Sequence, residues 1–359
     1  MRNLRLMSII PKFRRLRVPF FSSFTIFFDL GTTTTRIGVE NRGIVMREPS
    51  YIGYNSKLKE YIFFGQEAKT IVGKTPDFIQ ISRPISHAII ADFDAEVAFL
   101  RHCIETSIKP YLAEYAFIKP PIHSIASSPS IATEIERKAV EESLQKSGCT
   151  QVTIVDRALA TAAGSGFNVF SHEPQLIIDI GGGLVEISVV SGGGVVAQKV
   201  LKQAGDAMNK LIANYTYLKH GIVLGENTCE DLKVKLLTFE DNEEKITVRG
   251  KSLETGLPKS INLKSSDIRE ALIRQFHAIL DTTRELIENA PPEIADAIFK
   301  QGIALTGKMA TIPGIEKYFY QELKIDTFVV EHATDATMYG LMRIAKNQES
   351  LHNISSPTY

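Results

Sequence analysis

The sequence predicts an α/β protein of two similar halves that face each other across a central cleft. A short pattern occurs twice, as Asp-Leu-Gly-Thr-Thr-Thr-Thr-Arg-Ile-Gly-Val at 29–39 and as Asp-Ile-Gly-Gly-Gly-Leu-Val-Glu-Ile-Ser-Val at 179–189. The copies lie 150 residues apart (179 − 29), and each follows an apolar run and leads into an alternating one. That pattern is typical of a strand, a tight turn and a second strand. At 359 residues the chain is long enough for two domains with substantial cores.

The duplicated turns have the composition of a phosphate-binding clamp. Their small residues let backbone N–H groups approach an anion closely, and threonine hydroxyls add further donors. Asp29 and Asp179 end the first strand of each copy, where a carboxylate can hold a hydrated Mg²⁺. Two such turns facing each other would hold a nucleotide triphosphate from both sides. The alternative is a pair of glycine-rich hairpins without a ligand, but two matched copies favour the clamp.

The remaining elements follow in order along the chain. Residues 25–100 mix strand-like runs with turns, and Phe93 to Ile108 has the pattern of a helix. Thr133-Glu134-Ile135-Glu136 is a capping box that opens a helix ending near Gly148. We expect next a buried strand (Val152 to Val155), a small-residue helix (Ala158 to Ala163), a second hairpin (175–200), two helices (204–238), a β-rich insert (244–263), a long helix (Asp267 to Asn289) and a strand, turn and helix (Ile303 to Glu316). Such alternation indicates an α/β fold.

The overall composition argues against several classes of protein. The net charge is zero, with 23% charged and 44% hydrophobic residues, so charge gives no reason to expect nucleic acid as a partner. Cys103, Cys149 and Cys229 lie far apart, which indicates a reducing compartment and neither a disulfide framework nor a zinc site. No apolar run approaches the roughly 20 residues needed to span a bilayer.

Residues 1–23 form a basic and apolar extension. Its basic residues occur without any acidic residue and are Arg2, Arg5, Lys12, Arg14, Arg15 and Arg17. A signal peptide is excluded, because the apolar stretch runs into Phe27-Phe28-Asp29, which the first hairpin needs, and no A-x-A cleavage site intervenes. Two interpretations remain, a disordered basic tail and a short amphipathic segment that lies on an anionic membrane surface. We favour the second.

The order of these motifs resembles the actin, Hsp70 and sugar-kinase ATPase superfamily. Within it, the intervening segments are most similar to the bacterial actin family MreB. The stretches that carry the resemblance are Gly43-Ile44-Val45, Glu48-Pro49-Ser50, Gly65-Gln66-Glu67-Ala68-Lys69, Gly73-Lys74-Thr75-Pro76, Arg83-Pro84-Ile85, Ile90-Ala91-Asp92-Phe93, Gly225-Glu226-Asn227-Thr228-Cys229-Glu230-Asp231-Leu232-Lys233, Val248-Arg249-Gly250, Gly256-Leu257-Pro258, Pro291-Pro292-Glu293 and Leu305-Thr306-Gly307.

The resemblance covers roughly residues 24–346 and implies an actin-like ATPase fold. Two ribonuclease H-like halves would surround a nucleotide cleft, one at 24–166 with a small subdomain at about 50–92, the other at 167–346 with a small subdomain at about 207–264. Residues 347–359 would form a C-terminal tail.

The resemblance also implies that ATP and Mg²⁺ are the ligands, with Asp29 and Asp179 holding the ion through water. Glu230 and Lys233, one helical turn apart, would meet the ribose and adenine, although an ordinary surface ion pair would be preferred without the family context. Gly307 and Lys308 would lie under the base. The other residues implied to bind nucleotide are Gly31, Thr32, Thr33, Thr34, Thr35, Gly181, Gly182, Gly183, Gly205 and Asp206.

Several residues depart from the MreB pattern. Arg157 stands where the family has the glutamate that helps to position the attacking water, and an arginine cannot accept a proton. Leu184 and Val185 replace a threonine pair that faces the γ-phosphate, and Lys308 and Met309 replace glycines beneath the base. Phosphoryl transfer depends mostly on positioning and charge stabilisation. We therefore expect at most a weak ATPase and assign no catalytic residue.

The resemblance implies a cytoskeletal protein of bacterial cell-shape determination. It would form nucleotide-dependent filaments in the cytoplasm, peripheral to the inner membrane, with other cell-shape proteins as partners and without nucleic acid. Head-to-tail contacts that do not close into a ring generate such filaments. The alternatives are an active ATPase or chaperone of the superfamily and a degenerate scaffold that no longer binds nucleotide.

Overall fold

The structure is a computed structural model that describes residues 24–112, 120–347 and 351. The predicted membrane segment, residues 1–23, and nearly all of the predicted C-terminal tail lie outside the described residues.

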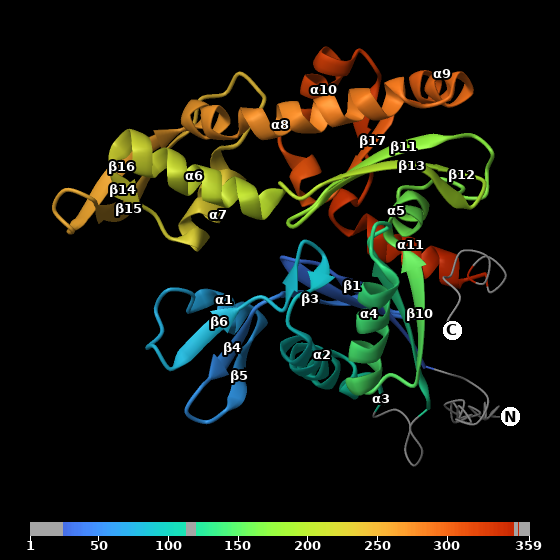
Figure 1. Ribbon diagram of the computed structural model, residues 1–359, viewed down its shortest axis with the longest axis horizontal. Coiled ribbons are helices and arrows are strands. Elements are labelled where there is room, and N and C mark those ends of the chain that lie inside the picture. The colour runs from blue at the N-terminus through green and yellow to red at the C-terminus, as the bar shows by residue number, and fades with distance from the viewer. Residues whose placement is uncertain (1–23, 113–119, 348–350, 352–359) are drawn as a thin grey trace, which may run out of the picture.

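Two five-stranded sheets form the centre of the molecule (Figure 1). The first contains β1 (Phe24–Leu30), β2 (Thr34–Val39), β3 (Gly43–Pro49), β9 (Ile122–Ser128) and β10 (Gln151–Asp156). The second contains β11 (Gln175–Ile180), β12 (Val185–Ser191), β13 (Gly194–Leu201), β17 (Ile303–Thr306) and β18 (Thr327–Val329). Their orders, β3-β2-β1-β9-β10 and β13-β12-β11-β17-β18, correspond strand for strand. In both, three antiparallel strands are followed by two parallel ones, so the predicted duplication is confirmed.

Helices cover the first sheet on both faces, which explains why β1 is apolar along most of its length. Ile26 and Phe28 of β1 pack with the helices α2 (Phe93–Ser107) and α4 (Glu134–Lys146). Phe27 points to the other face, into the core that contains α5 (Arg157–Gly164) and α11 (Ala336–Ala345). Because α5 also packs on β11–β13, these two helices lie between the sheets (Figure 1).

The predicted small-residue helix is α5, and its close neighbour is α11. A side chain at Gly164 would place its Cβ 1.7 Å from the carbonyl oxygen of Ala336, and one at Gly340 would lie 1.6 Å from that of Ala160. Only glycine allows the two helices to approach this closely. Thr161 and Thr337 join them further by a hydroxyl–hydroxyl hydrogen bond of 2.9 Å.

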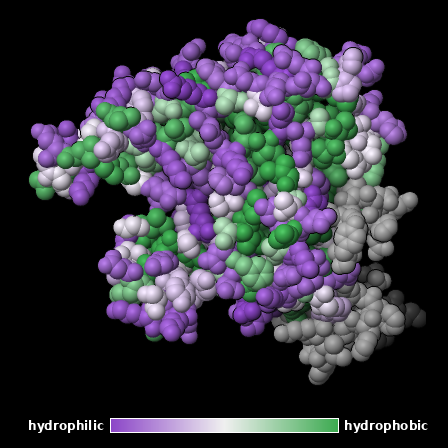
Figure 2. Space-filling view, viewed as in Figure 1, coloured by the Kyte–Doolittle hydropathy of each residue, from purple (hydrophilic) through white to green (hydrophobic). Residues whose placement is uncertain are grey.

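Two smaller lobes extend from the sheets on the same side of the molecule (Figure 1). One contains the sheet β5-β4-β6 and α1, and the other contains the sheet β14-β15-β16 with α6 and α7. Figure 2 shows the surface hollowed between the lobes, with mostly hydrophilic side chains around the hollow. The bounds are β4 Ile52–Asn55, β5 Glu60–Phe64, α1 Gly65–Thr70, β6 Ile79–Ser82, α6 Gly205–His220, β14 Ile222–Val223, α7 Glu226–Leu236, β15 Lys245–Ser252 and β16 Pro258–Lys264.

The local signals in the sequence correspond to real helix ends. Thr133 caps α4, since its hydroxyl accepts from the amide of Glu136 at 3.3 Å and its own amide donates to the Glu136 carboxylate at 2.7 Å. Among the described residues, no helix is both long and apolar enough to cross a bilayer. The remaining elements are β7 Ile85–Ser86, β8 Ile89–Ile90, α3 Lys109–Leu112, α8 Ser265–Glu288, α9 Pro292–Gln301, η1 Lys308–Thr311, α10 Ile315–Leu323 and η2 Ala333–Asp335.

Candidate nucleotide site

The two glycine-containing loops meet at the centre of the molecule. A Cβ at Gly182 would lie 2.4 Å from the Thr33 methyl group, and one at Gly183 would lie 2.1 Å from the Thr32 hydroxyl. The loops therefore approach each other closely only because positions 182 and 183 carry no side chain. Thr32 is itself held in place, since its hydroxyl accepts a 2.7 Å hydrogen bond from the amide of Ala88.

Two adjoining cavities open from these loops. The phosphate cavity has a volume of about 70 Å³, and the loops, Asp29 and Asp179 line it. The nucleoside cavity has a volume of about 360 Å³, within the range of roughly 300–1,000 Å³ that is common for small-molecule sites. Residues that line both and so join them are Thr33, Thr34, Gly181, Gly182 and Lys308.

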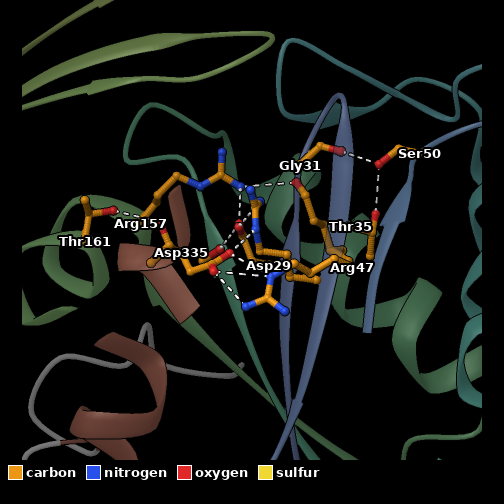
Figure 3. A network of polar contacts seen from close by, with 12 residues as sticks. Asp29, Gly31, Thr35, Arg47, Ser50, Arg157, Thr161 and Asp335 are labelled. Atoms are coloured by element: carbon orange, nitrogen blue, oxygen red, sulfur yellow. Dashed lines mark hydrogen bonds and ion pairs between the residues drawn. The ribbon is translucent and has the colours of Figure 1, made fainter. Parts of the chain in front are cut away.

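The structure brings nearly all the predicted nucleotide residues together. Those in the phosphate cavity alone are Asp29, Gly31, Thr32, Asp179, Gly183 and Gly307, and those in the nucleoside cavity alone are Gly205, Asp206, Glu230 and Lys233. Thr35 is the exception, because its side chain is fully buried and its hydroxyl is hydrogen-bonded to that of Ser50 at 3.0 Å (Figure 3). The nucleotide-binding roles of the residues that line the two cavities stay predictions, although these residues share one location.

Asp29 is surrounded by arginines (Figure 3). Arg36 Nη1 lies 3.1 Å from its Oδ2, and Arg157 Nη2 lies 3.4 Å from its Oδ1. Arg36 also forms an ion pair with Asp335, with 2.8 Å between Nε and Oδ1. Asp335 forms a second ion pair with Arg47, with 2.8 Å between Oδ2 and Nη2. These contacts connect β1, β2 and β3 to the start of α11, so the carboxylate at the first strand end belongs to an extended ion-pair network.

The equivalent positions in the second sheet are both acidic. Antiparallel pairing places Asp179 opposite Glu186, as it places Asp29 opposite Arg36 in the first sheet. Burial raises the pKa of Glu186 to about 7, and it also raises the pKa of Asp179, which accepts a hydrogen bond from the Thr306 hydroxyl at 3.2 Å. Burial, together with the negative charge of Asp179, favours retention of a proton by Glu186.

The two aspartates differ in how well they suit a hydrated Mg²⁺. Asp179 lines the cavity, and its side-chain hydrogen bond within the described part of the chain comes from the neutral hydroxyl of Thr306, so its carboxylate fits a water-mediated contact to the ion. The charge of Asp29 is already compensated by two guanidinium groups. Among the described residues, no group of three or more His, Cys, Asp or Glu side chains is arranged to hold a metal ion. A magnesium role for Asp29 and Asp179 remains a prediction.

The nucleoside cavity combines an apolar wall with two charged side chains of α7. The wall includes Val234, Leu237, Met309, Ile312 and Pro313, which suit a planar base. Burial lowers the pKa of Lys233 to about 8, and its Nζ donates to the carbonyl of Gly205 at 2.7 Å. Glu230 faces the other lobe, where its Oε2 lies 2.7 Å from Nζ of Lys69. Burial alone would raise the pKa of Glu230, but the ion pair with Lys69 outweighs it and the pKa is lowered.

Further contacts join the two lobes across the cleft. Arg83, which follows β6, is ion-paired with Asp206 at the start of α6 and with Glu226 at the start of α7. The Tyr51 hydroxyl also reaches Glu226, at 3.1 Å. In this structure ion pairs of Lys69 and of Arg83 therefore join the two lobes.

The position that the resemblance assigns to the water-positioning acceptor holds a basic residue. Arg157 is buried at the position where the resemblance implies a glutamate. Asp156, the neighbouring carboxylate, serves as the N-cap of α5 and accepts from the amide of Ala158 at 2.9 Å. Leu184 lines the phosphate cavity without a hydroxyl. A water molecule at the terminal phosphate would thus have no ionised carboxylate of α5 free to orient it.

Sequence reasoning did not single out several residues of the site. Arg36 and Glu186 could have been found from hairpin register, because they lie directly opposite Asp29 and Asp179. Lys69, Arg83 and Asp335 gave no local signal, since each meets its partner only through the tertiary fold.

Comparisons with known proteins agree with this fold. The profile of the family "MreB/Mbl protein" matches residues 23–353. The cell shape-determining protein Mbl of Bacillus subtilis is 33% identical over 329 residues, covering 91% of this chain and 97% of Mbl. The cell shape-determining protein MreB of Escherichia coli is 32% identical, covering 84% and 88%.

Solved structures show the same relationship. The crystal structure of MreB5 of Spiroplasma citri bound to ADP superposes with a TM-score of 0.85 at 31% identity, covering 90% of this chain and 97% of MreB5. A second structure of that protein, bound to AMPPNP, has a TM-score of 0.84 at 30% identity, covering 91% and 97%. These neighbours confirm the predicted actin-like α/β fold. With a family profile that spans nearly the whole chain, this protein belongs to the MreB/Mbl family of bacterial actin homologues.

Proposed function

We propose that this chain binds ATP between its two glycine-containing loops and assembles into cytoskeletal filaments that take part in determining cell shape. The observation that carries the proposal is the facing pair of loops, with a phosphate-sized cavity that opens into a nucleoside-sized one. The halves on either side would be residues 24–166 and 167–346. The structures of the MreB5 relative bound to ADP and to AMPPNP support nucleotide binding by this chain.

In this proposal the triphosphate lies along Gly31–Thr34 and Gly181–Gly183, where backbone N–H groups and hydroxyls are available as donors. Asp179 is the carboxylate that suits the usual partner ion of ATP, Mg²⁺, through water. The base lies against Met309 and Ile312, with Lys308 at the junction of the cavities. Hydrolysis is slow or absent, because Arg157 replaces the acceptor.

We propose further that filaments act at the inner face of the membrane. The support is the basic and apolar composition of residues 1–23, where each basic residue near an anionic surface contributes about 1 kcal/mol. Deleting residues 2–21 should reduce co-sedimentation with anionic vesicles, while the fold remains, because β1 begins at Phe24. High salt should weaken binding of the full chain. Full co-sedimentation of the truncated chain would contradict the membrane proposal.

Electron microscopy of the purified protein with and without ATP tests the assembly. Filaments that need ATP, together with phosphate release near background, would support the proposal. Rapid phosphate release without filaments would point instead to an active ATPase or chaperone of the superfamily. Neither filaments nor ATP binding would indicate a scaffold that no longer uses nucleotide.

A further inference from the structure

The basic side chains around the two cavities are nearly all engaged with the protein itself. Six of them line one or both cavities. Five have a partner, and the pairs are Arg36 with Asp29, Arg157 with Asp29, Arg47 with Asp335, Lys69 with Glu230, and Lys233 with the carbonyl of Gly205. The sixth is Lys308, whose ammonium group has no hydrogen bond or ion pair within the described part of the chain. Its charge is therefore available to a ligand.

Lys308 lies at the neck where the phosphate cavity and the nucleoside cavity meet. It lines both cavities, together with residues of the two facing loops, and its side chain is exposed. The backbone that leads to it is fixed, because a Cβ at Gly307 would lie only 2.6 Å from Oδ1 of Asp179. A nucleotide with its base in the nucleoside cavity and its terminal phosphate between the loops would pass Lys308 with the phosphates nearest the ribose.

The surroundings of Lys308 favour an anion at this neck. Burial is the main cause that lowers the pKa of Lys233 to about 8, and the positive charge of Lys308 lowers it further. The two ammonium groups are thus close enough to repel each other, while the nearby carboxylate of Glu230 is already paired with Lys69. A lysine presents three N–H donors on a flexible stem and binds phosphate as a point charge. A phosphate between Lys308 and Lys233 would relieve their repulsion.

Resting on the proposed ATP site, we infer that Lys308 holds the α- and β-phosphates of the nucleotide and so slows the release of ADP. ATP and ADP both carry these phosphates, so the contact persists after the terminal phosphate has been lost. The ligand class is a nucleoside di- or triphosphate with its metal ion. The MreB pattern has glycine at this position, which makes the contact a departure of this chain.

The competing role for Lys308 is obstruction of the base. Its stem stands where the pattern has only backbone, so it could narrow the nucleoside cavity instead of holding phosphate. The two roles predict opposite results for Lys308→Gly, because removal of the side chain weakens a phosphate contact but frees space for the base.

The experiment measures the dissociation constants of ATP and ADP by calorimetry on the full chain in excess Mg²⁺. Lys308→Met keeps most of the stem and loses the charge, so it should weaken both nucleotides about tenfold, equivalent to about 1.4 kcal/mol. Lys308→Gly should lose about as much, and Lys308→Arg, which keeps the charge, should stay within about threefold of the wild type. Release of a fluorescent ADP analogue from Lys308→Met should be about tenfold faster.

Lys210→Met is the matched control. Lys210 is an exposed lysine of α6 that also has no ion pair among the described residues, but it lines the neighbouring cavity beside Arg83 and neither the phosphate nor the nucleoside cavity. Its affinities for ATP and ADP should equal those of the wild type. Thermal unfolding of each variant confirms that it folds.

Three results would overturn the inference and leave the proposed ATP site intact. They are tighter nucleotide binding by Lys308→Gly, unchanged affinities in Lys308→Met, and a loss in Lys308→Met that is confined to ATP. Failure of both the wild type and Lys210→Met to bind ATP would instead remove the proposed function, and this inference with it.

Discussion

The ion pair between Lys69 and Glu230 links the two lobes over the nucleoside cavity, so breaking it should speed nucleotide release. Lys69 lies at the end of α1 and Glu230 in α7, with 2.7 Å between Nζ and Oε2. A second contact reinforces the position, because the Asn227 amide donates to the Lys69 carbonyl at 3.0 Å. Replacing Lys69 by methionine keeps the length of the side chain and removes only the charge.

The expected size of the effect follows from burial. The side chains of Lys69 and Glu230 are 24% and 19% exposed, between a surface pair and a fully buried one. Loss of one partner costs about 1 kcal/mol or less at the surface and about 3–5 kcal/mol when buried, so we take about 2 kcal/mol here. If that energy holds the cleft closed, Lys69→Met should accelerate release about 30-fold.

The assay follows dissociation of a fluorescent ATP analogue after addition of excess ATP. Lys74→Met is the matched control, because Lys74 belongs to the same lobe and its Nζ binds only the carbonyl of Thr70 at 3.1 Å among the contacts of described residues. Glu230→Gln should reproduce most of the acceleration, and the double variant should add little to either single change. Release rates of Lys69→Met within about twofold of the wild type would refute this account of the cleft.

Three further outcomes are expected. Burial raises the pKa of Glu96 from 4.5 to about 8, so between these values the folded chain holds a proton that the unfolded chain releases, and stability falls as pH rises by about 1.4 kcal/mol per unit. Urea unfolding of Glu96→Gln should lack this slope, and an identical slope in both proteins would contradict it. Arg157→Glu should raise phosphate release above the wild-type rate by supplying an acceptor, and an unchanged rate would show that another group is missing. Gly183→Val should abolish ATP binding by displacing Thr32, whereas Gly194→Ala, which meets no atom within 4 Å, should bind normally.

The sequence was sufficient for the duplicated sheets and for most of the site wall. The repeated Asp and Gly positions led directly to Asp29, Asp179 and Gly181–Gly183, because a local strand–turn–strand pattern determines where those side chains lie. The nucleoside wall was reached only through resemblance, since Glu230 and Lys233 alone suggest an ordinary helical ion pair.

Contacts between distant segments could not be predicted in this way. Lys69 and Glu230 lie on opposite lobes, and no periodicity relates them. The same holds for α11, whose Gly340 gives no sign in the sequence that it faces Ala160 of α5. Resemblance identified Arg157 as a departure, but only the fold shows that its guanidinium turns toward Asp29.

The glycine contact between α5 and α11 limits how these two helices can move against each other. Each helix lies directly against a backbone carbonyl of the other, so sliding along the contact would bring backbone atoms into collision. Rotation about the contact avoids that collision, which makes the helix crossing a pivot. The lobes lie far from this pivot (Figure 1), so a small turn of the helices moves the tips of the lobes furthest. A ligand that adjusts the cleft by a fraction of its width would thereby change the shape that each subunit presents to its neighbours.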